Sequence, residues 1–443
     1  MSSEARVKTT VATTTTGGGK GRRLRDLVAV NFGNTLEWYD WTIYSLFAPY
    51  FAVQFFNPDD AASALLATLA VFAVGFITRP LGGFLFGAYA DRAGRRKSLT
   101  VAMMLTAAGS LVIALAPTYQ SVGLFASVIL LSARLLQGLA HGGEMGTSVT
   151  YLVERAPTGR RALFGGTSWV SVVLGTILAT LTSLLLTSSL GEGELRSWGW
   201  RLAFGIGGVL GLYALYLRRR LTETDAFEET LQADRSAPTD IPGDATNRRL
   251  LHHWRGILVV FGLSVGGSVM FYTWLIFMPT YAQLHHGQAA SSALTASLIA
   301  QVFFLGAVLA AGWLGDRVGR KPMVIAFGVT FVALTVPVNL MIDGSFGTLL
   351  TAMLIALAAL ALLFGVNGAV WAEVFPTRVR ASGVAGPLSL ATAIFGGTAP
   401  YINTALTQAG HHDWFLYYLM VAAAITLVTG LLMNETRHAR LTR

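Results

Sequence analysis

The sequence predicts an all-α polytopic membrane protein, with twelve transmembrane helices in two pseudo-symmetric bundles of six. Charged residues make up only 12% of the 443 residues and hydrophobic residues 53%, whereas a soluble domain has about 25% charged residues. Apolar windows of about twenty residues, long enough to cross a bilayer, recur along the chain. Two charged segments of the first half also recur in the second half, which indicates an internal duplication.

Hydropathy along the chain predicts where the transmembrane spans, the tails and the linker lie. The expected spans are 27–55, 63–89, 98–117, 122–152, 162–189, 201–218, 256–283, 292–314, 321–341, 346–373, 382–407 and 413–433. The polar, Thr- and Gly-rich segment 1–26 predicts a disordered cytoplasmic tail, and the segment 434–443 predicts a second tail. Residues 219–254 mix charges with proline and predict a cytoplasmic linker. The N-terminal bundle is then 27–218 and the C-terminal bundle 255–433.

The basic residues predict the orientation of the spans. Lys and Arg gather in alternate loops, while loops such as NPDDAAS and LHHGQAAS have none. Basic loops stay in the cytoplasm, so both termini are expected there, in a multi-pass protein of the inner or plasma membrane. The net charge of +9 therefore reflects topology and not a nucleic-acid partner. The chain has no cysteine, which excludes disulfides and thiolate metal sites.

The duplicated segments are charged turns. The first is FGAYADRAGRRKS at 86–98 with its copy AGWLGDRVGRKP at 311–322, and the second is VERAPTGRR at 153–161 with its copy AEVFPTRVR at 372–380. The matched charged residues are Asp91, Arg92, Arg95 and Glu154 in the first half, and Asp316, Arg317, Arg320 and Glu373 in the second. Parallel duplicated halves are typical of transporters that bind their substrate between the halves.

We expect these eight residues to act as a cytoplasmic gate. The glycines permit positive φ in the turn, the repeated Asp can accept bonds at a helix N-terminus, and the arginines can bond to the repeated Glu. Such a cluster is strong while it is dry and weak once it is wet, so it can open when the halves rock. The alternative is that the bases only fix the orientation, although this would not require the same Gly and Asp spacing twice.

Ionisable groups within the spans are candidate coupling and binding residues, because each costs roughly 2.5–3.5 kcal/mol to insert. Glu37, Asp40 and Tyr44 share one face of the first span. Two nearby carboxylates resist joint ionisation, so one is expected to carry a proton. The alternative is that Glu37 or Asp40 only bonds a neighbouring helix. Arg79 lies deep in the second span, and its guanidinium fork matches a substrate carboxylate or one of these acids.

The fourth span carries a polar stripe. Arg134, Gln137, His141 and Glu144 recur at helical spacing. Arg134 is expected to bias the protonation of a nearby acid, and Glu144 to be that acid or a gate; the alternative is that both only hold helices together. His141 can titrate near neutral pH, but a lone histidine is more often a packing residue. The C-terminal half offers only uncharged candidates, such as Tyr272 and Asn367, to orient a ligand.

Several segments resemble the major facilitator superfamily and, within it, the metabolite:proton symporter family. They include GNTLEWYDWTIYSLFAPYF, RPLGGFLFGAYADRAGRRKS, SWGWRLAFGIGG and EVFPTRVRASGV, while GGEMGTSVTYLVE and GGSVMFYTW look most similar to the α-ketoglutarate permeases. The resemblance implies a major facilitator fold, a monomer, and a coupling role for Arg134 in LLSARLLQG. It also implies that Arg201 receives a substrate carboxylate, against the alternative of an interfacial arginine beside Trp198 and Trp200.

The expected function is proton-coupled import, by alternating access, of a small di- or tricarboxylate such as α-ketoglutarate. Arginines favour an anion, with protons, the substrate and the lipid bilayer as partners. The alternative cargo is a zwitterionic osmolyte such as proline or betaine, or another organic acid such as citrate or shikimate. A non-transporting sensor is disfavoured because it would need an appended signalling domain. The sequence has no P-loop, HExxH or GxSxG motif and no metal-ligand cluster, so neither an enzyme nor a cofactor is expected.

Overall fold

The computed structural model describes residues 18–57, 61–157, 159–221, 223, 228, 252–399, 402, 403, 406, 409, 411–439 and 441. Within these ranges the secondary structure is helical, and no strand occurs. The first helix begins at Gly18, inside the segment expected to be a disordered tail. The expected linker, 219–254, lies mostly outside the described residues.

The N-terminal bundle contains α1 (Gly18–Phe55), α2 (Ala61–Ala93), α3 (Arg95–Leu115), α4 (Tyr119–Val122), α5 (Leu124–Arg155), α6 (Arg161–Ser189), α7 (Glu192–Glu194) and α8 (Trp200–Arg219), with a π-helical turn at Leu195–Gly199. The C-terminal bundle contains α11 (Trp254–Phe271), α12 (Met278–His286), α13 (Ala290–Val318), α14 (Arg320–Leu340), α15 (Phe346–Phe364), α16 (Asn367–Glu373), α17 (Arg380–Ala391) and α19 (His412–Leu432), with π-helical turns at Tyr272–Phe277 and Thr392–Gly396 and a 3-10 turn at Thr377–Val379.

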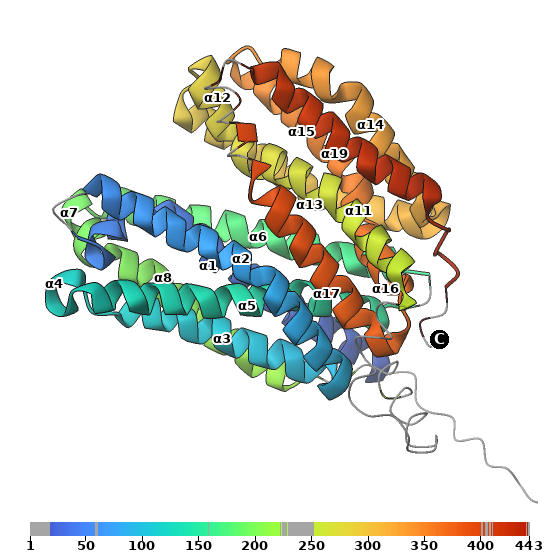
Figure 1. The fold of residues 1–443 in the computed structure, drawn as a ribbon, viewed down its shortest axis with the longest axis horizontal. Coiled ribbons are helices and arrows are strands. Elements are labelled where there is room, and N and C mark those ends of the chain that lie inside the picture. Colours follow the sequence, from blue (N-terminus) through green and yellow to red (C-terminus); the bar gives the residue numbers. More distant parts are fainter. Residues whose placement is uncertain are drawn as a thin grey trace, which may run out of the picture.

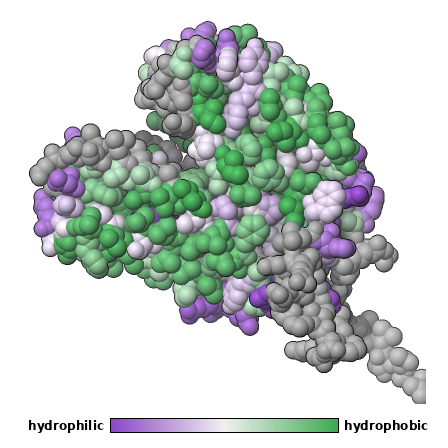
Figure 2. All heavy atoms as spheres, viewed as in Figure 1, coloured by the Kyte–Doolittle hydropathy of each residue, from purple (hydrophilic) through white to green (hydrophobic). Residues whose placement is uncertain are grey.

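These helices match the expected spans. In the described part of the chain, nine helical stretches are long and apolar enough to cross a membrane, and α1, α2 and the α17 segment account for the other expected spans. Large apolar side chains such as Ile77, Leu115 and Leu432 are more than 70% exposed on the outer surface, and Figure 2 shows broad hydrophobic areas over both bundles. A surface of this kind suits a lipid environment, so the prediction of an all-α multi-pass fold is confirmed.

The two bundles meet at one end and separate at the other. In Figure 1 the N-terminal bundle (blue to green) and the C-terminal bundle (yellow to red) diverge toward α7 and α12 and converge near α16 and α17. Helices α2 and α5 pack against α17, and α6 packs against α13. We call the converging end, which carries the charged turns, the basic end, and the other the open end. The molecule is therefore closed at the basic end, and Figure 2 shows its surface hollowed between the bundles at the open end.

Glycines fix two features that position the site. Gly94 and Gly319, the repeated glycines of the charged turns, have φ of 99° and 117°, which disfavours any residue with a side chain. A Cβ at Gly142 of α5 would lie 1.9 Å from the backbone oxygen of Arg79 in α2. Helices α2 and α5 therefore touch backbone to backbone, which sets Arg79 beside the His141 turn of α5.

Candidate functional site

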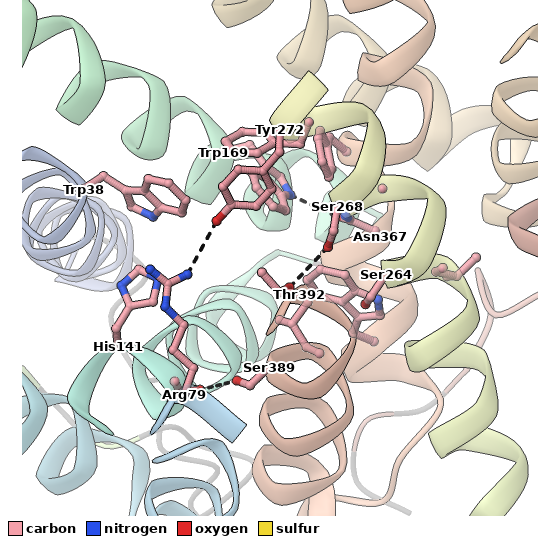
Figure 3. Close-up of a pocket in the computed structure, with 17 residues that line it drawn as sticks. Trp38, Arg79, His141, Trp169, Ser264, Ser268, Tyr272, Asn367, Ser389 and Thr392 are labelled. Atoms are coloured by element: carbon pink, nitrogen blue, oxygen red, sulfur yellow. Dashed lines mark hydrogen bonds between the residues drawn. The ribbon is translucent and has the colours of Figure 1, made fainter. Parts of the chain in front are cut away.

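A cavity lies between the two bundles and has about 540 Å³ of empty space, part of it open to solvent. Its N-terminal wall includes Trp38, Arg79, His141 and Trp169, and its C-terminal wall includes Ser264, Ser268, Phe271, Tyr272, Phe364, Asn367, Trp371, Ser389 and Thr392. Figure 3 shows Arg79 and His141 on one side of this space and the α11 and α17 residues on the other. Of the sequence-predicted substrate residues, the fold thus brings together Arg79, Tyr272 and Asn367.

Arg79 is the central feature of the cavity. Its side chain is only 2% exposed, and its guanidinium lies 4.1 Å from the ring centre of Trp41 and 3.8 Å from that of Phe76. Its Nη1 is 3.5 Å from the Tyr272 hydroxyl, and its Nε has no hydrogen-bond partner. Among the described residues, no carboxylate lies within ion-pair distance of this guanidinium. A buried cation without an anion is costly, so the site suits an anionic ligand.

Further donors around the cavity lack acceptors. The indole N–H groups of Trp38 and Trp371 are buried and have no hydrogen-bond partner among the described residues. Asn367 accepts a 3.0 Å hydrogen bond from Trp169 Nε1, which holds its amide in the wall. Unpaired donors on both bundles favour a ligand rich in acceptor oxygens.

Beside the cavity, α1 packs against α5 along a row of polar residues that we call the polar seam. It consists of Glu37, Asp40 and Tyr44 on α1 and of Arg134, Gln137, His141 and Glu144 on α5. Asp40 is fully enclosed in it. The carboxylate accepts hydrogen bonds from Ser110 Oγ (2.5 Å) and Gln137 Nε2 (2.9 Å), and Arg134 Nη1 lies 3.3 Å away. The Arg134 guanidinium stacks over the Tyr44 ring at 3.8 Å.

The next position along the seam pairs Glu37 with His141. The Nδ1 atom of His141 lies 2.7 Å from Glu37 Oε1, and both side chains are less than 5% exposed. Trp38 and Trp41 enclose the imidazole, with ring centres 5.4 and 5.5 Å from it. Since His141 also lines the cavity, this pair connects the seam to the substrate space.

Arg218 is a functional candidate that the sequence did not reveal. It forms a buried ion pair with Glu144 and donates a 3.0 Å hydrogen bond to the Leu99 carbonyl. It lies against Gly33, where a Cβ would overlap its guanidinium. In the sequence Arg218 begins a run of three arginines at a helix end, which suggests only a cytoplasmic loop. Glu144 is thus already paired inside the N-terminal bundle.

Two predicted substrate residues lie away from the cavity. Arg201 donates two 2.8 Å hydrogen bonds, to the Ala114 and Ala116 carbonyls at the C-terminal end of α3, and stacks on Trp200 at 4.3 Å. These contacts are favourable because the C-terminal end of a helix attracts a cation. Tyr44 donates its hydroxyl to the Thr68 carbonyl and lies in the seam. Neither residue is carried into the proposed substrate site.

At the basic end the duplicated acids join the two bundles. Asp91 of α2 accepts hydrogen bonds from the Ala381 and Ser382 amides at the start of α17, at 3.0 and 2.8 Å. In the related position, Asp316 of α13 accepts 3.0 Å bonds from the Ala162 and Leu163 amides at the start of α6. Each acid therefore caps a helix of the opposite bundle, which the repeat alone could not indicate.

The repeated glutamates bridge the bundles in the same way. Glu154 lies 2.6 Å from Arg380 of the C-terminal bundle and 3.6 Å from Arg95 of its own. Glu373 accepts a two-pronged contact from Arg320 at 3.1 and 3.2 Å. It also lies 3.5 Å from Arg161 of the N-terminal bundle. We call these two groups the paired latch. Arg92 and Arg317 are exposed beside it, with Arg317 stacked on Trp313 at 3.9 Å.

Residues after α19 complete the basic end. Glu435 accepts hydrogen bonds from the backbone amides of Arg320 and Lys321 at the start of α14, at 2.9 and 3.0 Å. Partial burial raises the pKa of Glu435, but these bonds and the nearby Arg320 charge outweigh it and hold the pKa below its ordinary value. Thr436 donates to Glu373 at 2.7 Å. The latch therefore includes part of the segment expected to be a simple tail.

Comparison with known proteins agrees with this architecture. Residues 27–237 match the family described as "Sugar (and other) transporter". The chain is 36% identical over 423 residues to the alpha-ketoglutarate permease of Escherichia coli (strain K12), covering 94% of each. It is 34% identical to the glycine betaine/proline/ectoine/pipecolic acid transporter OusA of Dickeya dadantii (strain 3937), covering 94% of this chain and 84% of the relative. It is also 33% identical to a citrate-proton symporter of Klebsiella pneumoniae, covering 88% and 86%.

Solved structures show the same fold. The proton:xylose symporter XylE bound to 6-bromo-6-deoxy-D-glucose superposes with a TM-score of 0.78 at 18% identity, covering 96% of this chain and 98% of that one. An inward open conformation of the xylose transporter XylE from E. coli superposes with a TM-score of 0.61 at 20% identity, covering 95% and 98%. At these identities the likeness concerns the arrangement of helices.

Proposed function

The chain belongs to the major facilitator superfamily, within its metabolite:proton symporter family, and is a proton-coupled transporter and not an enzyme; for its cargo we propose a small di- or tricarboxylate such as α-ketoglutarate, imported by alternating access. We place it in the inner or plasma membrane as a monomer, with both termini and the basic end in the cytoplasm. The orientation rests on the Lys and Arg of the basic-end loops.

The observation that carries the proposed substrate is Arg79. Its guanidinium is buried, lines the cavity and has no described carboxylate partner. A substrate carboxylate would supply two acceptor oxygens in the plane of the fork, and such charge-assisted bonds are roughly twice as strong as neutral ones. The free indole donors of Trp38 and Trp371 lie on opposite bundles, so the oxygens of one dicarboxylate would bind both walls. A ligand that bonds both bundles favours their closure around it.

For proton coupling we propose Asp40 with Arg134. Asp40 is dry, and its three donors favour its ionised form. Protonation would break the ion pair and free Arg134 to change partners. Because both groups are buried, separating this ion pair costs free energy when only the proton or only the substrate is bound. Coupled transport requires that these partly loaded states be unfavourable. Glu144 is assigned a supporting role, since Arg218 already neutralises it.

For gating we propose that the paired latch holds the cytoplasmic side shut in the state described here. The carboxylates and guanidiniums of its ion pairs are at least 94% buried, except Arg161. When the bundles rock apart, water would enter and the same pairs would each be worth at most about 1 kcal/mol. The latch therefore stabilises one end state and releases cooperatively.

A zwitterionic osmolyte is the second candidate, favoured by the aromatic wall. Trp169 stacks on Phe364 at 3.9 Å, and Phe271 lies 5.7 Å from both Trp169 and Trp38. Such walls bind quaternary ammonium groups by cation–π attraction. A betaine would place its carboxylate on Arg79 and its ammonium against these rings. The single carboxylate would leave more donors unpaired than a dicarboxylate does.

Uptake into proteoliposomes distinguishes these substrates. An imposed pH gradient, acid outside, should drive accumulation of labelled α-ketoglutarate, and labelled glycine betaine is tested in parallel. Unlabelled α-ketoglutarate, citrate, shikimate, proline and glycine betaine are added as competitors in both assays. We expect α-ketoglutarate or another carboxylate to compete most strongly and betaine at least tenfold more weakly. Strong uptake of betaine that α-ketoglutarate does not inhibit would replace the dicarboxylate by the osmolyte.

A further inference from the structure

The two carboxylates of the polar seam have different surroundings. Asp40 has three donors around it, one of them a guanidinium. Glu37 has only His141 Nδ1 within ion-pair distance among the described residues, and neither of its oxygens accepts a well-directed hydrogen bond there. When Asp40 ionises, the adjacent Arg134 guanidinium compensates its negative charge. When Glu37 ionises while His141 stays neutral, a buried charge is left without a cation in contact.

The charged groups that face the Glu37–His141 pair come from four helices. They are Asp40 on α1, Arg79 on α2, Glu144 on α5 and Arg218 on α8. Arg218 is committed to Glu144, and Asp40 is committed to Arg134. Arg79 is therefore the cation left to balance an ionised Glu37, although it lies beyond ion-pair distance. From the C-terminal bundle, the Tyr272 hydroxyl lies 3.5 Å from Arg79, and the Ser389 hydroxyl donates a 2.8 Å hydrogen bond to the carbonyl of Gly142, the residue after His141.

A bound substrate changes this balance. A carboxylate on Arg79 satisfies the guanidinium and adds a negative charge next to His141, which lines the same cavity. An ionised Glu37 would then be uncompensated in a nearly dry site. One proton shared between the carboxylate and the imidazole removes this charge, whichever of the two atoms holds it. Binding of the substrate and binding of this proton therefore favour each other.

We infer that the Glu37–His141 pair takes up a second coupling proton, distinct from the one on Asp40, when a carboxylate binds at Arg79. The inference rests on the proposed function, which it deepens by giving the transport stoichiometry. The proton enters from the open end through the cavity, and it leaves with the substrate when the basic end opens. The pair carries one proton in the loaded state and none in the unloaded state. A dianion would then cross with two protons and without net charge.

The ratio of protons to substrate tests this inference. Proteoliposomes containing the full chain are clamped at zero potential with potassium and valinomycin, between pH of roughly 7 and 8, where carboxylates stay ionised. The substrate is whichever of labelled α-ketoglutarate, citrate, proline or glycine betaine accumulates. One coupled proton allows about tenfold accumulation per pH unit, and two allow about a hundredfold. We expect about a hundredfold for the wild type.

Three variants locate the second proton. Glu37→Gln and His141→Gln should each reduce the limit to about tenfold per pH unit, while Glu37→Asp should retain about a hundredfold. Glu192→Gln is the control, because Glu192 is exposed and its acid pairs only with Arg196 among the described residues; it should match the wild type. Either glutamine variant is sufficient if the other fails to fold in detergent.

The outcomes separate the inference from the proposed function. A wild-type limit of about tenfold overturns the inference and leaves carboxylate import standing. A wild-type limit of about a hundredfold that neither glutamine variant lowers also overturns it. Accumulation of betaine alone, with the expected loss in the variants, overturns the proposed substrate and supports the second proton. No accumulation of any of these compounds under the pH gradient overturns both.

Discussion

Neutralising Glu154 should open the basic end. Glu154 and Asp91 face Arg95 and Arg380, so two acids balance two guanidiniums in a buried group. In Glu154→Gln, Arg380 loses the carboxylate that lies 2.6 Å from it, and Arg95 loses the one at 3.6 Å. Removing one partner of a buried ion pair costs about 3–5 kcal/mol, because the other charge stays buried. This free-energy cost applies to the closed state, because opening of the basic end exposes the two arginines to water. The ratio of closed to open molecules should therefore fall about a hundredfold or more.

The absence of cysteine makes this shift measurable with introduced labels. Gln120 on α4 and Ala289 before α13 are exposed at the open end on opposite bundles. Spin labels on cysteines at these positions report the width of that end by double electron–electron resonance. In Glu154→Gln we expect the long distance of the state described here to give way to a shorter one. Glu373→Gln, its counterpart in the duplicated half, should act likewise.

The matched control is Glu194→Gln, an exposed acid of α7 outside the latch, which should leave the distances unchanged. Folding of each variant is checked by its thermal unfolding. If Glu154→Gln and Glu373→Gln both fold and both keep the wild-type distances, the latch does not hold this state and the reasoning from buried charge is wrong.

Three further predictions concern coupling, packing and pH. Asp40→Asn should abolish accumulation driven by a pH gradient but retain exchange of labelled for unlabelled substrate, and loss of both activities in folded protein would count against its coupling role. Gly142→Ala should destabilise the protein by about 1–3 kcal/mol or more, because its Cβ would lie 1.9 Å from the Arg79 carbonyl oxygen; thermal unfolding measures this, with Gly205→Ala, which has no neighbour within 4 Å, as control. Glu435 has a folded pKa lowered from 4.5, so its stabilisation is present above pH 4.5 and is lost as the pH falls through the folded pKa. Glu435→Gln should therefore lower the Tm near neutral pH and lose this effect in acid, and a deficit that does not depend on pH would contradict the assignment.

The sequence predicted the elements and the helix faces well. Apolar length gave the spans, and the spacing of Arg134, Gln137, His141 and Glu144 correctly predicted a single polar face. Periodicity works here because the 3.6-residue repeat fixes which residues of one helix point the same way. The repeated glycines likewise indicated turns with positive φ, as Gly94 and Gly319 show.

The partners of these residues could not be predicted in the same way. Glu144 pairs with Arg218, which lies 74 positions away, and Asp91 caps a helix 290 positions away. Residues so far apart in the chain produce no local sequence pattern that predicts their contact. The contact depends on how whole helices are rotated and on which helices are neighbours. Arg201 illustrates the converse, since its place beside an α3 terminus follows from the packing of α8 and not from its neighbours in sequence.

The central claim is that a buried, unpaired guanidinium recognises the substrate. The most direct measurement is the KM for pH-driven α-ketoglutarate uptake in Arg79→Lys. The control is Arg201→Lys, in which the same substitution is made at an arginine outside the cavity. A lysine loses the planar two-pronged contact, so we expect Arg79→Lys to raise the KM at least tenfold and Arg201→Lys to change it less than twofold. An unchanged KM in folded Arg79→Lys would contradict the account.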